Sequence, residues 1–198
     1  MERMRMAAVA ALLATGIGSA PAQNLIVNPN FGGDTSGWIS DAGTTIFFDG
    51  NQDANASAGS GAMAMQPTSG FTVSAHQCVA ITDGDTFSFG AQVKPNTVIS
   101  FGMACLAFPV PGCNIDPIDS AAAIVAGPPG EGGWIQLRSA SPYVLPAGTQ
   151  GISCIITGSL QPPARMQQPD GTSTSMWVDN VFFAQGTTPV MLQAFQIE

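Results

Sequence analysis

Hydrophobic and polar positions alternate with a period of two along most of the chain after residue 22. Between residues 85 and 93, for example, small or polar residues separate Phe87, Phe89, Ala91 and Val93. This is the period of a β-strand with one buried face. The same reasoning predicts strands at residues 24–28, 44–48, 62–66, 71–81, 85–93, 98–108, 134–140, 143–145, 152–157 and 175–185. Because turn residues separate them and no long helical period intervenes, the pattern predicts an all-β, antiparallel β-sandwich.

Residues 109–133 are the longest stretch without such alternation, and they are rich in Pro and Gly. We expect this stretch to be mainly irregular, with only residues 121–126 able to form a short helix or strand. Loops of this length are uncommon and are often functional.

The strand predicted at residues 175–185 is apolar on both faces, which is typical of a strand covered on both sides. Alternation places Trp177, Asp179, Val181 and Phe183 on one face. Asp179 is the polar exception, and an inward carboxylate needs backbone N–H groups, a cation or water as a partner. Asp179 is therefore predicted either to anchor an incoming loop or to ligate a metal.

The N-terminus has the three parts of an export signal. Arg3 and Arg5 supply positive charge, residues 6–17 are apolar, and Ala20-Pro-Ala22 is a small-residue cleavage sequence. We expect a signal peptide at 1–22, a sandwich domain at 23–186 and an apolar tail at 187–198 that docks on it. The apolar run is too short for a permanent membrane anchor. The mature protein is thus predicted to be secreted or periplasmic, without membrane insertion.

The chain is acidic, with 13 Asp and Glu against five Lys and Arg. Signal cleavage would remove Arg3 and Arg5 and leave Lys94, Arg138 and Arg165 as the basic residues. No basic stripe remains that could neutralise phosphates. Nucleic acids and anionic membrane surfaces are therefore poor candidates as partners.

Four cysteines in an exported chain predict two disulfides. Cys105 and Cys154 are in phase with apolar neighbours and point into the core, whereas Cys78 is out of phase and could reach Cys113 in the long loop. Side-chain phase thus favours Cys78–Cys113 with Cys105–Cys154 over the alternative of Cys105–Cys113 with Cys78–Cys154. With a single histidine and no paired CxxC, a zinc site is not expected.

Several motifs together resemble carbohydrate-binding modules of the galactose-binding-like jelly-roll type. The specific ones lie at the two ends: Asn24-Leu-Ile-Val-Asn-Pro-Asn-Phe31 with Gly37-Trp38, and Val178-Asp-Asn-Val-Phe182. More generic strand motifs lie between them, at Gln77-Cys-Val, Asp85-Thr-Phe-Ser-Phe and Gly133-Trp134. The resemblance covers nearly the whole mature chain. It implies a jelly roll of two sheets and a glycan or polysaccharide as partner.

The resemblance also implies a structural calcium between the turn after the first strand and the Asp of the last strand. Asp179 matches the latter position. Gly32 stands where the family commonly has an acidic residue, and Asp34 is the nearby replacement. A structural calcium on Asp179 and Asp34 is therefore possible, with backbone hydrogen bonding by Asp179 as the alternative.

Sugar binding needs a flat aromatic ring and polar groups that reach hydroxyls. The predicted polar platform consists of outward-pointing side chains on two strands, 85–93 and 134–140. Trp177 is the candidate ring that stacks on a sugar. The candidate ligand-binding residues are Ser88, Gln92, Gln136, Arg138 and Trp177. Trp38 and Trp134 are instead expected to pack in the core.

Signals for catalysis are weak. The chain has no nucleophile elbow, zinc-protease motif or phosphate loop, and His76, its only imidazole, is expected to be a solvated strand residue without a partner. Only Asp116 with Asp119 or Glu131 could be imagined as a glycosidase pair. We therefore expect a non-catalytic glycan-binding module, with a structural or adhesive sandwich domain as the alternative and a small glycoside hydrolase as the third hypothesis.

Overall fold

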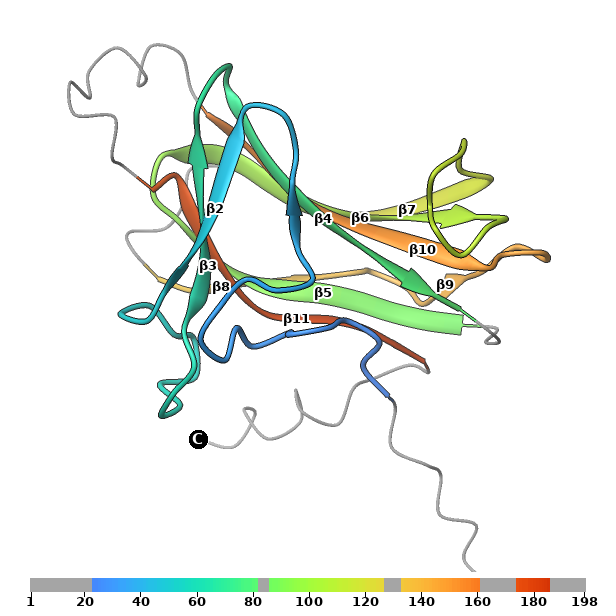
Figure 1. The fold of residues 1–198 in the computed structure, drawn as a ribbon, viewed down its shortest axis with the longest axis horizontal. Helices are drawn as coiled ribbons and strands as arrows, with labels where there is room; N and C mark the ends of the chain where they lie inside the picture. The colour runs from blue at the N-terminus through green and yellow to red at the C-terminus, as the bar shows by residue number, and fades with distance from the viewer. Residues whose placement is uncertain (1–22, 82–85, 127–132, 161–173, 186–198) are drawn as a thin grey trace, which may run out of the picture.

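The computed structural model describes residues 23–81, 86–126, 133–160 and 174–185. These residues contain no helix and form two antiparallel sheets packed face to face, so the predicted β-sandwich is confirmed (Figure 1). The predicted signal peptide, its cleavage point, the tail at 187–198, Glu131 and Arg165 all lie outside the described residues. In the described ranges no helix has the length and hydropathy needed to span a bilayer.

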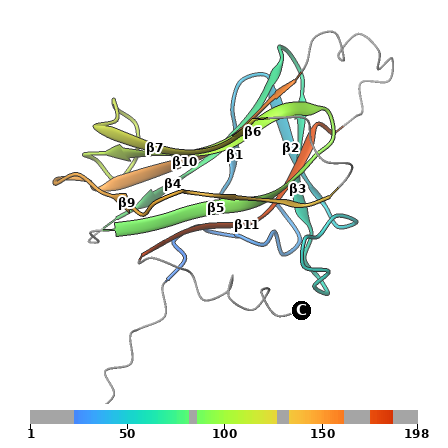
Figure 2. The same cartoon turned by 180° about the vertical axis from the view of Figure 1, so that it is seen from behind.

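The first sheet has the strand order β1-β4-β10-β6-β7. Its strands are β1 (Ile39–Ser40), β4 (Thr72–Ala80), β10 (Gly151–Leu160), β6 (Val98–Phe108) and β7 (Asp119–Ala126). The second sheet has the order β2-β3-β11-β5-β8, and β9 also pairs with β5. Its strands are β2 (Thr44–Asp49), β3 (Ala62–Pro67), β11 (Met176–Gln185), β5 (Thr86–Pro95), β8 (Ile135–Arg138) and β9 (Tyr143–Val144). Figure 2 shows the two layers from behind.

The core lies between the two sheets and is built from the faces that alternation predicted. Phe87, Phe89, Ala91 and Val93 of β5 are all buried and belong to it. Phe87 stacks on Phe183 of β11, with ring centroids 4.5 Å apart and an interplanar angle of 12°. Both rings belong to the second sheet, and together they give it a large apolar surface in the core.

The segment that was expected to form a short helix or strand, 121–126, is a strand, and this strand, β7, begins two residues earlier, at Asp119. Residues 119–126 pair antiparallel with β6 without interruption, from Ala107 opposite Asp119 to Ser100 opposite Ala126. Alanine-rich segments have low intrinsic strand propensity. The open edge of β6 supplies the partner backbone groups that turn this segment into an edge strand.

The segment before Phe31 packs against the edge of β11 and does not form a full strand. Asn24 forms an isolated β-bridge with Ala184 of β11. In addition, Leu25 N–H donates a hydrogen bond to Phe183 O at 2.9 Å. Gln77, a buried residue of β4, clamps Val27: its Oε1 accepts from Val27 N–H at 2.6 Å and its Nε2 donates to Val27 O at 3.0 Å. This segment can reach β11 because β3 pairs with β11 only at residues 176–178.

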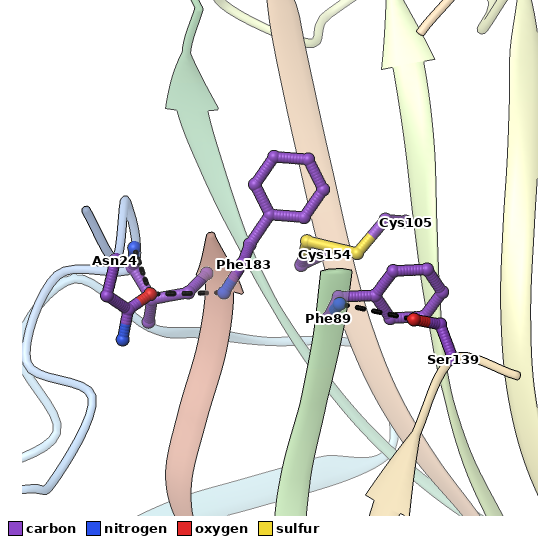
Figure 3. The surroundings of a disulfide bond; sticks show 7 residues. Asn24, Phe89, Cys105, Ser139, Cys154 and Phe183 are labelled. Carbon is purple, nitrogen blue, oxygen red and sulfur yellow. Dashed lines mark hydrogen bonds between the residues drawn. A yellow bond between two sulfur atoms is a disulfide. The ribbon is translucent and has the colours of Figure 1, made fainter. Parts of the chain in front are cut away.

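The structure has the disulfide pairing that side-chain phase favoured. Cys105 and Cys154 lie directly opposite each other on β6 and β10, and both are fully buried (Figure 3). Cys78, on the outward side of β4, is bonded to Cys113 in the loop before β7. One bridge therefore crosses neighbouring strands inside the core, and the other holds a surface loop.

Candidate functional site

A β-bulge in β11 determines which side chains reach the surface of the second sheet. The register between β11 and β5 shifts between Asp179 and Phe182, so Asn180 and Val181 together oppose one residue of β5. Asn180 has a φ of 47°, a left-handed conformation that asparagine tolerates better than most residues. The extra residue reverses the alternation.

The predicted shared face of Trp177, Asp179, Val181 and Phe183 is therefore wrong. Val181 and Phe183 are in the core, whereas Trp177 and Asp179 lie on the opposite side with Phe182. The physical reason is that one inserted residue moves every later side chain to the other face.

We call the side of the second sheet that faces away from the core the outer face. Strand register brings all five predicted binding residues onto it, because Trp177 pairs with Lys94, Asp179 with Gln92, Gln92 with Gln136, and Gly90 with Arg138. Ser88 lies two residues before Gly90 on β5, on the same face, and it is buried. Their part in binding stays a prediction, but the sheet gathers them as the sequence suggested.

Trp177 lies across β3 on the outer face. Its indole Nε1–H donates to Asp49 Oδ2 at 2.9 Å, although β3 separates β11 from β2. The indole must therefore pass over Ala62 and Ala64, the small residues that β3 places on this face, and both are buried beneath it. The alanines let a half-buried ring lie down on the sheet, and Asp49 fixes its orientation.

Phe47 and Lys94 extend this row, and sequence reasoning missed both. Phe47 of β2 pairs with Ala64 and its side chain is 38% exposed. Lys94 Nζ lies 5.6 Å from the centroid of the Trp177 ring and donates to Gln52 Oε1 at 2.8 Å. The signal for Phe47 was present, because two consecutive phenylalanines in a strand must point to opposite faces.

Trp38 and Trp134 differ in their burial. Trp38 is 7% exposed and packs near Phe31 with ring centroids 6.1 Å apart, as predicted. Trp134 is only partly buried and does not belong to the core. Trp134 directly precedes β8. Because side chains alternate along a strand, Trp134 lies on the same side as Gln136 and Arg138. This corrects its expected core position and adds an aromatic residue beside the outer face.

The loop between β2 and β3 is fastened to the bulge by side chains. Asp179 Oδ2 accepts from Ala54 N–H at 3.0 Å, and Asn55 Nδ2 donates to Asn180 Oδ1 at 2.7 Å. Asn180 Nδ2 in turn donates to Gln92 Oε1. Gln92 therefore supports the bulge with its carbonyl oxygen, in addition to lying among the predicted binding residues.

Asp179 and Asp34 do not fit the calcium site that the family resemblance implied. The two oxygens of Asp179 receive the backbone N–H groups of Ala54 and Asn180, at 3.0 and 2.7 Å. Asp34 Oδ1 receives Asn28 Nδ2 and Ser36 N–H, each at 3.0 Å. Among the residues described, no three His, Cys, Asp or Glu side chains form a group that could hold a metal ion. The geometry of Asp179 is that of a loop anchor.

Burial of Asp179 gives the stability a specific pH dependence. Desolvation raises the pKa of its carboxyl to about 6. The hydrogen bonds from the Ala54 and Asn180 backbones lower this pKa, but their effect is smaller than that of desolvation. The folded state then binds more protons than the unfolded state between about pH 4 and 6. We expect this group to make the free energy of unfolding fall by up to about 3 kcal/mol as the pH rises through that window.

Urea unfolding of the wild type and of Asp179→Asn at pH 4, 5, 6 and 7 measures this contribution. The slope between pH 4 and 6 should be present only in the wild type. The pKa of Asp34 is lowered, chiefly by the hydrogen bond from the Ser36 backbone N–H. Asp34 should therefore contribute little to the change in unfolding free energy between pH 4 and 6. Parallel pH profiles of the two proteins would contradict the assignment.

A pocket of about 540 Å³ opens where β5 and β8 meet the turn before β9. It is lined by Ser88, Arg138, Ser139, Ala140, Ser141 and Pro142. Its volume is in the range of small-ligand sites, and the polar side chains among its described lining residues are hydroxyls and one guanidinium. Two predicted binding residues, Ser88 and Arg138, thus share one concavity.

The candidate catalytic groups do not converge on this pocket. His76 has a partner, contrary to expectation: its Nδ1 lies 2.8 Å from Asp41 Oδ1, and Ser74 hydrogen-bonds the other carboxylate oxygen. The serine contacts the carboxylate and not the imidazole, so the cluster lacks an activated nucleophile. Asp116 and Asp119 are exposed, in the loop before β7 and at its first position, on the other sheet.

Comparisons with known proteins find similarity in structure only. No family model matches the chain, and no curated protein matches its sequence. The xylan-binding domain CBM22-1 of Paenibacillus barcinonensis Xyn10C superposes with a TM-score of 0.54 at 12% identity, over 84% of this chain and 96% of that one. A CBM61 domain solved with β-1,4-galactotriose gives a TM-score of 0.51 at 12% identity, over 83% and 99%.

A third similar structure is the enzymatically active domain of tailspike protein 4 from bacteriophage CBA120. Its TM-score is 0.57 at 16% identity, and the match covers 83% of this chain but only 21% of that one. Identities this low establish the fold alone. The chain is a jelly-roll β-sandwich, similar in fold to carbohydrate-binding modules.

Proposed function

We propose that the protein is a non-catalytic, exported module that binds a glycan or polysaccharide on its outer face. The observation that carries this proposal is the Trp177 ring, which lies across β3 and is held there by Asp49. An oriented indole offers a flat apolar surface to a sugar ring at little entropic cost. Gln136 and Arg138 of β8 lie further along the same face, and their amide and guanidinium groups supply the types of hydrogen-bonding group that bind sugar hydroxyls.

The two disulfides support the exported location. All cysteines are paired, and such bonds persist in oxidising compartments and are rare in the cytosol. The apolar segment at residues 6–17, with its arginines and cleavage sequence, supplies the route of export.

The arrangement of carboxylates supports a binding role over glycoside hydrolysis. A glycosidase needs two carboxyl groups on either side of the scissile bond, about 5–10 Å apart. Among the described residues that line the pocket on the outer face there is no Asp or Glu. Asp179, the buried acid of this face, already accepts two backbone N–H groups.

The test is a titration of the mature protein with soluble oligosaccharides and a retention assay on insoluble polysaccharides. We expect dissociation constants on the order of micromolar to millimolar, because the contact is shallow. Trp177→Ala and Phe47→Ala should each weaken binding by roughly tenfold, since each removes an apolar surface for a sugar ring.

Phe71→Ala is the matched control, because Phe71 is 46% exposed and precedes β4 of the other sheet. Circular dichroism must show that each variant is folded. If the wild type is retained on no polysaccharide, the glycan proposal fails and a structural or adhesive role takes its place. If Phe71→Ala weakens binding and Phe47→Ala does not, the site lies elsewhere on the molecule.

A further inference from the structure

Strand register aligns the aromatic side chains of the outer face in one row that crosses the strands. Trp134 belongs to this row because the pairing of β5 with β8 ends with Val93 opposite Ile135, so the next residues, Lys94 and Trp134, lie at the same level. Trp177 in turn pairs with Lys94 from the other side. We call this line the aromatic row; from β2 to β8 it contains Phe47, Ala64, Trp177, Lys94 and Trp134.

A second row beside the aromatic row is polar. Asp179 pairs with Gln92, and Gln92 pairs with Gln136. Each of these residues is two positions from a member of the aromatic row, and side chains two positions apart on a strand share a face about 7 Å from each other. The apolar and the polar row therefore run parallel, and both cross the strands.

The polar row is covered at its β11 end and accessible at its β8 end. The loop between β2 and β3 lies over Asp179, whose Oδ2 accepts Ala54 N–H at 3.0 Å. Gln52 of the same loop accepts a hydrogen bond from Lys94 Nζ at 2.8 Å. Gln136 is exposed. The loop thus borders the aromatic row near Trp177, and an amide group accompanies the row where it reaches β8.

The two rows match the two kinds of surface on a chain of pyranose sugars. A sugar ring has faces of C–H groups, which suit aromatic rings, and an edge of hydroxyls, which suits amide groups. The length of one sugar unit is close to the spacing between strands, so a row across five strands offers about five sugar positions. Only a straight chain stays on such a row, because a coiled chain turns away from it.

The other possible direction, along the strands, leads away from the aromatic side chains. Thr86 of β5 pairs with Val144 of β9, and Thr86 precedes Lys94 by eight residues, about 27 Å along the strand. Val144 is 64% exposed and lies on the outer face, because its neighbour Tyr143 points into the core. Val144 therefore marks the end of the path that a chain along β5 would take.

We propose that the outer face binds a straight, unbranched polysaccharide chain, with units joined through equatorial bonds, and that this chain crosses the strands from Phe47 to Trp134. The inference rests on the proposed glycan-binding function and names the class of glycan and its direction. Trp177 contacts a central unit, and Trp134 is a further binding residue at the β8 end. The amide of Gln136 binds hydroxyls at the edge of the chain.

Calorimetric titrations with oligosaccharides of increasing length test the shape of the chain. The probes are cello-, xylo- and manno-oligosaccharides from the disaccharide to the hexasaccharide, and maltohexaose is the coiled control. For at least one straight series, the affinity of the wild type should rise roughly tenfold from the trisaccharide to the pentasaccharide and then level off, because the row crosses five strands. Maltohexaose should bind roughly tenfold more weakly than the best straight hexasaccharide.

Three variants test the direction of the chain. Trp134→Ala should lower the affinity for the hexasaccharide about tenfold and leave that for the trisaccharide unchanged, because a short ligand binds over Trp177. Trp134→Phe keeps a ring and should retain most of the affinity. Val144→Ala is the matched control on the same face and should change neither affinity. Circular dichroism must show that each variant is folded.

Several results would overturn this inference and leave the glycan-binding proposal standing. These are equal affinities for the trisaccharide and the hexasaccharide, equal binding of maltohexaose, or a hexasaccharide affinity that Trp134→Ala leaves unchanged. A larger loss for Val144→Ala than for Trp134→Ala would show that the chain runs along the strands. Retention on a polysaccharide without binding of any straight hexasaccharide would contradict the proposed shape. If the wild type binds none of these sugars and is retained on no polysaccharide, both proposals fail.

Discussion

Replacing Cys105 and Cys154 together with alanine should lower the free energy of unfolding by about 4 kcal/mol or more. The bridge joins residues 49 positions apart, and closing a loop of that length restricts the unfolded chain by about 4 kcal/mol. Both sulfurs also fill space in the core, where Cys105 and Cys154 are fully buried. Their removal adds the cost of a small cavity to the loss of the crosslink.

The control is the pair of substitutions Cys78→Ala and Cys113→Ala. This bridge closes a loop of 35 residues, so the crosslink itself contributes nearly the same amount. Cys78 and Cys113 are only partly buried, however, and their removal leaves no core cavity. Urea unfolding should therefore show the larger loss for the core pair. A larger loss for Cys78 and Cys113 would mean that the surface loop contributes more to stability than the core packing suggests.

Phe183→Ala should cost about 3–5 kcal/mol of unfolding free energy. Phe183 has no exposed surface and stacks on Phe87 with ring centroids 4.5 Å apart. Truncation removes the apolar burial of a whole ring and leaves a cavity between the sheets. Denaturant titration measures the loss, and the slope of the transition should stay unchanged if only the native core is affected.

Phe47→Ala is the matched substitution, since Phe47 is 38% exposed on the outer face. It should cost about 1 kcal/mol or less, in proportion to the smaller apolar area that it buries. The comparison also tests the bulge in β11, because uninterrupted alternation would put Phe183 on the side of Trp177. Comparable losses at Phe183 and Phe47 would contradict the core position of Phe183.

On the outer face the residues that anchor the loop and the candidate binding residues share one member, Gln92. Asp179 and Asn180 fasten the loop between β2 and β3, and Gln92 supports Asn180. Trp177 and Arg138 lie at either end of that support, on β11 and β8. Substitutions of Asp179 or Asn180 should therefore change stability before affinity.

From the amino-acid sequence alone we could predict the all-β class, the core face of β5 and the favoured disulfide pairing. These features depend on the period of two and on the phase of a residue relative to its neighbours, which are local properties of the chain. The same alternation indicated four of the candidate binding residues, Ser88, Gln92, Gln136 and Arg138, whereas Trp177 was chosen because it follows a polar loop. Their position on one sheet face follows from β11, β5 and β8 being neighbours.

The register between strands became known from the folded structure and could not be predicted from the sequence. The bulge at Asn180 separates Asp179 from Phe183, and no pattern in residues 175–185 indicates where an extra residue is accommodated. The partners of Asp179, Trp177 and His76 likewise come from segments distant in sequence, at Ala54, Asp49 and Asp41. Alternation specifies which residues can share a face, but strand pairing and packing specify which of them meet, because those contacts form between segments whose spacing along the chain carries no local signal.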